Sequence, residues 1–77
     1  MKNKILEILR EIDSVYDYEK SQDFFADGYL DSFDLTRLIA IFEDKFGISI
    51  GGDDLNADNF KSIPAMEALL ARHGVKA

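Results

Sequence analysis

The first apolar positions of the chain recur at the spacing of an α-helix. They stand three or four residues apart and form one stripe, made of Ile5, Ile8, Leu9 and Ile12. The polar side of the same segment carries Glu7, Arg10 and Glu11. A helix with one apolar stripe buries that stripe against the rest of the protein. The pattern therefore predicts an amphipathic helix over about residues 2–14.

A second, broader apolar pattern lies in the middle of the chain. Its members are Phe33, Leu35, Leu38, Ile39, Ile41, Phe42 and Phe46. Gly47 supplies a stop signal. Asp31 and Asp34 stand three residues apart at the start, as in a capping box with aspartate in the usual Glu/Gln place, and both favour the positive end of the helix dipole. We expect a capped helix over 33–46, with Leu30 and Phe33 anchoring its start on the core.

The rest of the chain predicts one more long helix and two irregular connections. After Pro64, the segment PAMEALLARHG predicts a final helix that buries Met66, Leu69 and Leu70 and stops before Gly74. Residues 15–31 break the helical period, and we expect a long loop whose Tyr and Phe side chains pin it to the core. A loop of about 17 residues is unusually long for a compact domain, which indicates a function.

The segment GISIGGDDLNADN alternates isoleucines briefly but has no second strand to pair with. We expect an extended loop in which Ile48 and Ile50 fill the core, followed by one short helix in NADNFKS that packs Leu55 and Phe60. The predicted fold is an all-α, small four-helix bundle with three main helices, one short helix and a long first loop. It forms a single domain over residues 1–77.

Composition narrows the possible functions. The chain has no cysteine, so neither disulfides nor a cysteine-ligated metal can hold it. The net charge is −6, and residues 23–59 alone carry nine acids and two bases. Such a field repels nucleic acid and anionic lipid and attracts partners with basic patches, although acidic surfaces also serve solubility alone. No apolar run is long enough to span a bilayer and the start does not read as a signal peptide, so we expect a cytoplasmic location. We also expect a monomer.

Residues of the kind that catalyse reactions or bind metals are sparse. His73 is the single histidine, and we expect a solvated residue at a helix end. Asp54, Asn56 and Asp58 match the first ligand positions of an EF-hand loop, but Asn59 and Ala65 replace its required glycine and glutamate. The adjacent acids Glu43 and Asp44 splay apart on a helix. We therefore expect neither a metal site nor an enzyme.

One junction remains, ADGYLDSFDLTRL, with Ser32 at the start of the central helix. A bare Asp-Ser pair is a common helix start, but Gly28 allows a tight turn, Leu30 anchors the loop, and Asp31 and Phe33 flank the serine. With these neighbours the chain resembles the phosphopantetheine-dependent acyl carrier family, whose DSL motif stands here as Asp31-Ser32-Phe33. GYLDS is similar to the form seen in aminoacyl and stand-alone carriers. DKFGISI and DLNADNFKSIPAMEALL are similar to the family's later helices, so the resemblance runs from about Ile5 to Leu70.

The resemblance implies a covalent cofactor, a thiol-bearing 4'-phosphopantetheine arm joined to Ser32 through a phosphodiester. It also implies the partners: a phosphopantetheinyl transferase that moves the arm from coenzyme A with Mg²⁺, an acyl- or aminoacyl-adenylating ligase, and downstream acyl-processing enzymes. The arm would hold an acyl or aminoacyl group as a thioester and present it to those enzymes. The docking surface would lie on the central helix and include Asp34, Thr36, Arg37, Ala40 and Glu43.

The chain departs from the family at several positions. Phe33 replaces the commonest leucine, Arg37 stands where fatty-acid carriers show an acid, and Thr36 and Ala40 are smaller or more polar than usual. These departures, together with GYLDS, favour a specialised pathway over housekeeping fatty-acid synthesis. Two alternatives stay open: a fatty-acid synthesis carrier, and an unmodified acidic helical module that binds a basic partner.

Overall fold

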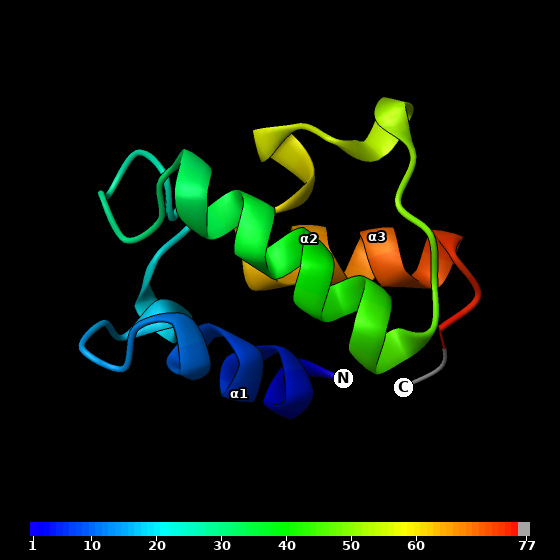
Figure 1. The fold of residues 1–77 in the computed structure, drawn as a ribbon. Coiled ribbons are helices and arrows are strands. Elements are labelled where there is room, and N and C mark those ends of the chain that lie inside the picture. The colour runs from blue at the N-terminus through cyan, green and yellow to red at the C-terminus, as the bar shows by residue number, and fades with distance from the viewer. Residues whose placement is uncertain (76–77) are drawn as a thin grey trace.

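The computed structural model describes residues 1–75, and its α-helices are α1 (Lys2–Ile12), α2 (Ser32–Phe46) and α3 (Ile63–Arg72) (Figure 1). One-turn 3-10 helices interrupt the connections at Tyr18–Lys20, Gly52–Asp54 and Ala57–Asn59. Residues 1–75 contain no strand. The all-α prediction is confirmed.

Helix α1 buries the stripe that its sequence predicts. Ile5, Ile8 and Leu9 are at most 1% exposed, Leu6 joins them, and Ile12 is partly buried. The helix ends at Ile12, two residues before the predicted end. Asp13 has already turned to an extended conformation, with φ −156° and ψ 119°, although its N–H still donates to the carbonyl of Leu9.

Helix α2 has the predicted cap and the predicted stop, but one predicted anchor is wrong. Asp31 and Asp34 form the capping box, and Gly47 takes the left-handed conformation after the last turn at φ 63°. Leu38 and Phe42 are the buried residues of the helix, whereas Phe33 is 81% exposed. Phe33 precedes Phe42 by nine residues, about two and a half turns at 3.6 residues per turn, so the two side chains leave opposite sides of the helix.

Helix α3 also follows its sequence signals. The Ser62 hydroxyl caps it by accepting the N–H of Ala65, Pro64 lies in its first turn, and Gly74 follows its end at φ 80°. The buried stripe contains the predicted residues and one more: Ile63, Met66, Leu69 and Leu70.

The segment between α2 and α3 agrees with its prediction only in part. Ile50 is buried, Ile48 is partly buried, and Phe60 is fully buried. The expected short helix is a single 3-10 turn at Ala57–Asn59, with a second such turn at Gly52–Asp54 before it. Leu55 lies between the two turns and is 46% exposed, so its predicted packing is wrong. The Asn59 side chain donates to the Asp54 carbonyl across this bend, and Leu55 is the residue that ends the first one-turn helix.

The core joins all three helices with the two connections. Helix α1 packs against both α2 and α3, and α2 runs obliquely across the view in Figure 1. Tyr18, Phe24 and Leu30 of the first connection are buried in the same core, as the predicted pinning of that loop requires. Within residues 1–75 no helix has the length and apolar character that crossing a membrane would need.

Candidate functional site

Ser32 is the first residue of α2, and its side chain is exposed. The residue before it, Asp31, is extended, and its carboxylate accepts the N–H of Asp34 at 2.9 Å. In return the N–H of Asp31 donates to the Asp34 carboxylate at 3.2 Å. No group among residues 1–75 hydrogen-bonds to the Ser32 hydroxyl, while the Ser32 carbonyl accepts the hydroxyl of Thr36. The backbone at Ser32 is therefore held firmly, and its hydroxyl is left open to solvent.

A tight turn leads the chain into Ser32. Gly28 has φ 77°, the left-handed region that glycine enters without steric cost, and its N–H donates to Phe25. The N–H groups of Tyr29 and Leu30 both donate to the carbonyl of Phe24, at 2.8 and 3.2 Å. The Leu30 side chain is 4% exposed, so its predicted role as an anchor is confirmed. The turn thus ends on a buried leucine two residues before the serine.

A cluster of aromatic side chains packs around this turn. The rings of Tyr16 and Tyr29 stack with centroids 4.5 Å apart, and Tyr18 meets Phe24 edge to face at 5.3 Å. The Tyr18 hydroxyl donates to the Asp13 carbonyl at 2.7 Å. Burial, helped by nearby carboxylates, raises the pKa of Tyr18 to about 12. The sequence showed that aromatic residues pin this loop, but the tyrosine spacing gave no sign that Tyr16 and Tyr29 would stack.

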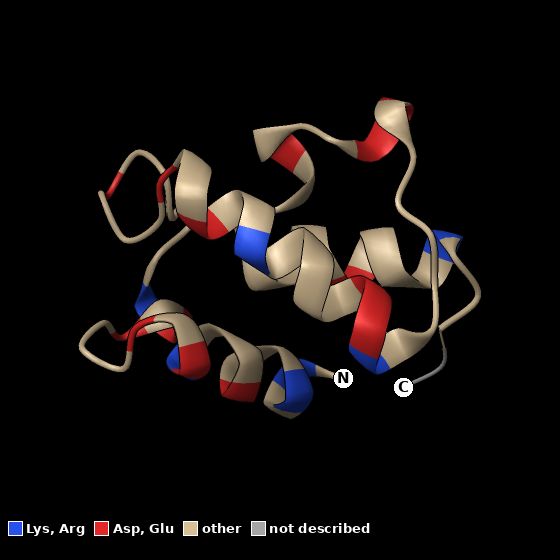
Figure 2. Ribbon diagram, viewed as in Figure 1, with Lys and Arg blue, Asp and Glu red and all other residues tan. Residues whose placement is uncertain are grey.

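Acids lie on the turn before Ser32 and on the first turn of α2, and several of them also serve the local backbone. Figure 2 shows them on the turn before α2 and on its first turn. Asp23 accepts the N–H groups of Phe25 and Ala26, and Asp27 accepts the Ser21 hydroxyl. A hydrogen bond does not neutralise a carboxylate, so the negative field around Ser32 persists.

The predicted docking residues divide into two groups. Thr36, Arg37 and Ala40 are exposed on α2. Asp34 belongs to the capping box, and the Glu43 carboxylate accepts the N–H of Ile50 at 2.9 Å, so both are partly buried and serve the fold. Arg37 lies 3.9 Å from Asp34, a surface pair of little energetic consequence. The exposed group is therefore the one most accessible to another protein.

His73 does not behave as the sequence predicts. Its side chain is 21% exposed, and its Nε2 atom lies 2.9 Å from the carboxylate of Asp54. Arg72 reaches the same carboxylate at 3.4 Å. These contacts tie the end of α3 to the segment before it, and the hydrogen bond from His73 is the main cause that lowers the pKa of Asp54. The expected solvated histidine is thus a paired one, because the 52–60 segment folds back onto it.

The same residues offer little for catalysis. The Ser32 hydroxyl has no base within hydrogen-bonding distance among residues 1–75, and activation of a serine requires one. Within that range no three His, Cys, Asp or Glu side chains are grouped closely enough to hold a metal ion.

Residues 3–70 match a protein-family model described as the phosphopantetheine attachment site. The chain belongs to this family. Members of the family carry 4'-phosphopantetheine covalently, and carrier domains are not catalytic themselves. Such carriers work with phosphopantetheinyl transferases and acyl-processing enzymes. No curated protein and no solved structure matches this carrier.

The residues around Ser32 fit a phosphodiester-linked arm. The serine lies at the N-terminus of a 15-residue helix, where unpaired N–H groups and the helix dipole favour a phosphate. Its exposed hydroxyl lets a transferase approach, and the turn before it is anchored at Leu30. The carboxylate of Asp31 opposes the phosphate charge, but it already accepts one of the helix N–H groups.

Proposed function

We propose that this protein is an acyl or aminoacyl carrier in which Ser32 bears the 4'-phosphopantetheine arm. The observation that carries the proposal is the open Ser32 hydroxyl on the first residue of a firmly capped helix. The arm supplies a thiol for the thioester, which the chain itself lacks because it contains no cysteine.

Each neighbour of Ser32 has a distinct part in this function. The capping box of Asp31 and Asp34 fixes the backbone at Ser32 and with it the direction in which the serine side chain projects from the helix. Gly28 and Leu30 hold the incoming turn. Phe33, 81% exposed, presents an aromatic ring beside the attachment point. We infer that this ring contacts the enzymes that modify or load the carrier, because it lies next to the attachment point and aromatic side chains are enriched at protein interfaces.

The surface of α2 supports a specialised pathway. The exposed members of the expected docking surface, Thr36, Arg37 and Ala40, include one base and no acid. A fatty-acid carrier that presents acids on this helix would meet a different, more basic partner. We therefore propose loading by a dedicated adenylating ligase, with fatty-acid synthesis as the alternative.

The test is a mass measurement of the intact protein. After incubation with coenzyme A, Mg²⁺ and a broad-specificity phosphopantetheinyl transferase, the wild type should gain one phosphopantetheinyl group. Ser32→Ala should gain none. Ser49→Ala is the matched control, because Ser49 is also exposed but follows α2, and it should be modified like the wild type. An unmodified wild type would favour the acidic interaction module instead.

The pathway is tested separately with the modified carrier. Arg37→Glu introduces an acid at the position of α2 where fatty-acid carriers show one. We expect this variant to improve as a substrate for fatty-acid synthesis enzymes and to be loaded more slowly by its own ligase, as measured by thioester formation. Equal use of the wild type and the variant by fatty-acid enzymes would contradict the specialised role.

A further inference from the structure

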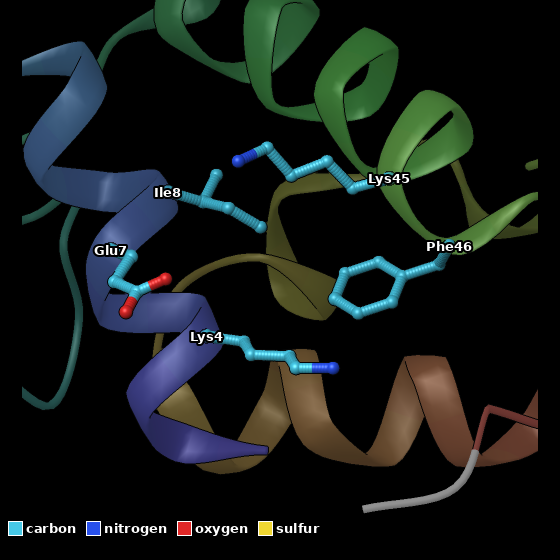
Figure 3. A pocket seen from close by; sticks show the side chains of 5 residues that line it. All are labelled: Lys4, Glu7, Ile8, Lys45 and Phe46. Atoms are coloured by element: carbon cyan, nitrogen blue, oxygen red, sulfur yellow. The ribbon is translucent and has the colours of Figure 1, made fainter.

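A pocket of about 320 Å³ opens between α1 and the last turn of α2 (Figure 3). Its lining residues are Lys4, Glu7, Ile8, Lys45 and Phe46. The volume lies at the lower end of the range for small-molecule sites, about 300–1,000 Å³. The pocket therefore suits a small ligand.

The walls of the pocket combine apolar surface with cations. Figure 3 shows the Phe46 ring and the Ile8 side chain extending into the space between the helices. Lys45 extends from α2 toward Ile8, and Lys4 extends from α1 toward the Phe46 ring. Lysine stems cover apolar surface while their ammonium groups stay in water. The pocket thus has an apolar interior with ammonium groups at two of its edges.

The two lysines differ in their pairing. The Lys45 ammonium lies 3.2 Å from the Glu11 carboxylate. Lys4 has no carboxylate within 4 Å among residues 1–75, although Glu7 lines the same pocket. Lys4 is therefore the cation at the pocket that remains available to a ligand.

The pocket is separate from the serine. Ser32 and Lys45 are 13 residues apart on α2, about 20 Å at 1.5 Å per residue, and their side chains leave the helix in nearly opposite directions at 3.6 residues per turn. A ligand here would not occupy the place of an arm on Ser32, and the inference does not depend on the proposed function.

We propose that this pocket binds a free alkyl carboxylate. The alkyl chain lies against the Phe46 ring and the lysine stems, over the buried Ile8, and the carboxylate pairs with the Lys4 ammonium. One small anion can use this local cation, whereas an extended anionic surface would meet the repulsion of a chain with net charge −6.

The probe is sodium octanoate, kept below its micelle concentration and followed by amide chemical shifts of the full chain. We expect saturable shifts in the amides of Lys4, Glu7, Ile8, Lys45 and Phe46, with little change around Ser32. Acetate, which lacks the chain, and octylamine, which reverses the charge, should bind more weakly. Shifts centred elsewhere, no saturation, or equal binding of octylamine would overturn the proposal.

A matched pair of variants tests the role of the cation. Lys4→Gln should weaken octanoate binding about 1.5- to fivefold, the effect of losing one exposed ion pair. Arg10→Gln removes an exposed cation of α1 that does not line the pocket, and it should bind like the wild type. Both positions are exposed, so the fold tolerates both changes. Equal affinities of Lys4→Gln and the wild type would refute the proposed carboxylate contact.

Discussion

The capping box at the start of α2 makes a sharp prediction about stability. Replacing Asp31 by alanine removes the oxygen that accepts the Asp34 N–H at 2.9 Å. Replacing it by asparagine keeps an oxygen acceptor in the same place and removes only the charge. If the cap is the main contribution of Asp31, the two variants must differ.

The magnitudes follow from the geometry. Loss of an N-cap acceptor costs about 0.5–2 kcal/mol, and the 2.9 Å bond places Asp31→Ala near about 1 kcal/mol or above. Asparagine caps a helix as well as aspartate does, so Asp31→Asn loses only the charge–dipole interaction, about 0.3–1 kcal/mol and less at high salt. For a domain of this size, 1 kcal/mol corresponds to about 4–8 °C in Tm.

Urea unfolding followed by circular dichroism measures these differences. We expect the order wild type, then Asp31→Asn, then Asp31→Ala, with the gap between wild type and Asp31→Asn shrinking in 0.5 M salt. Asp44→Ala is the control, since Asp44 is an exposed acid of α2 outside the cap, and it should lie within about 0.5 kcal/mol of the wild type. Equal destabilisation by Asp31→Asn and Asp31→Ala would refute the capping explanation.

Three further predictions concern the core and the two perturbed groups. Leu30→Ala should cost about 2–5 kcal/mol in urea unfolding, because Leu30 is 4% exposed. Burial raises the pKa of Tyr18 to about 12. The contribution of neutral Tyr18 to the free energy of unfolding should therefore be complete below pH 10 and lost as pH rises from about 10 to 12. Tyr18→Phe should lack this pH dependence. The hydrogen bond from His73 lowers the pKa of Asp54. The wild type should therefore be more stable than Asp54→Asn at neutral pH, and this difference in stability should disappear as the pH falls below about 4 and passes the lowered pKa. Both tests compare the unfolding midpoint of the wild type with that of the variant across the stated pH range. An assigned pKa shift is wrong if wild type and variant show the same pH dependence.

The features that the sequence predicted correctly are local ones. The apolar stripes of α1 and α3 repeat within a few residues, and so does the spacing of Asp31 and Asp34 in the capping box. Gly47 and Gly74 follow helix ends in the left-handed region that their residue type favours. Such features depend on neighbours within about one or two helical turns, which a single sequence displays directly.

The features that the sequence missed depend on how distant segments meet. Phe33 belongs to the apolar pattern of α2, but it lies on the side opposite Phe42, and α1 and α3 do not cover it. Leu55 is apolar, yet the bend between two 3-10 helices leaves it exposed. Pairing of His73 with Asp54 joins residues 19 positions apart. Hydropathy and periodicity do not record which sides of a helix its neighbours cover.

The acids around Ser32 show why a residue can serve both the fold and a partner. Asp23, Asp31 and Asp34 each accept backbone N–H groups, so the turn and the first turn of α2 need an acceptor at these positions. An asparagine or serine could satisfy much of that need without charge. Beyond the backbone acceptors and the charge–dipole interaction at α2, aspartate at all three positions therefore adds a negative field that remains in place at a fixed orientation, because hydrogen bonding orders the carboxylates without neutralising them. A basic partner approaching Ser32 would meet ordered charges, which lose less conformational entropy on binding than flexible surface acids do.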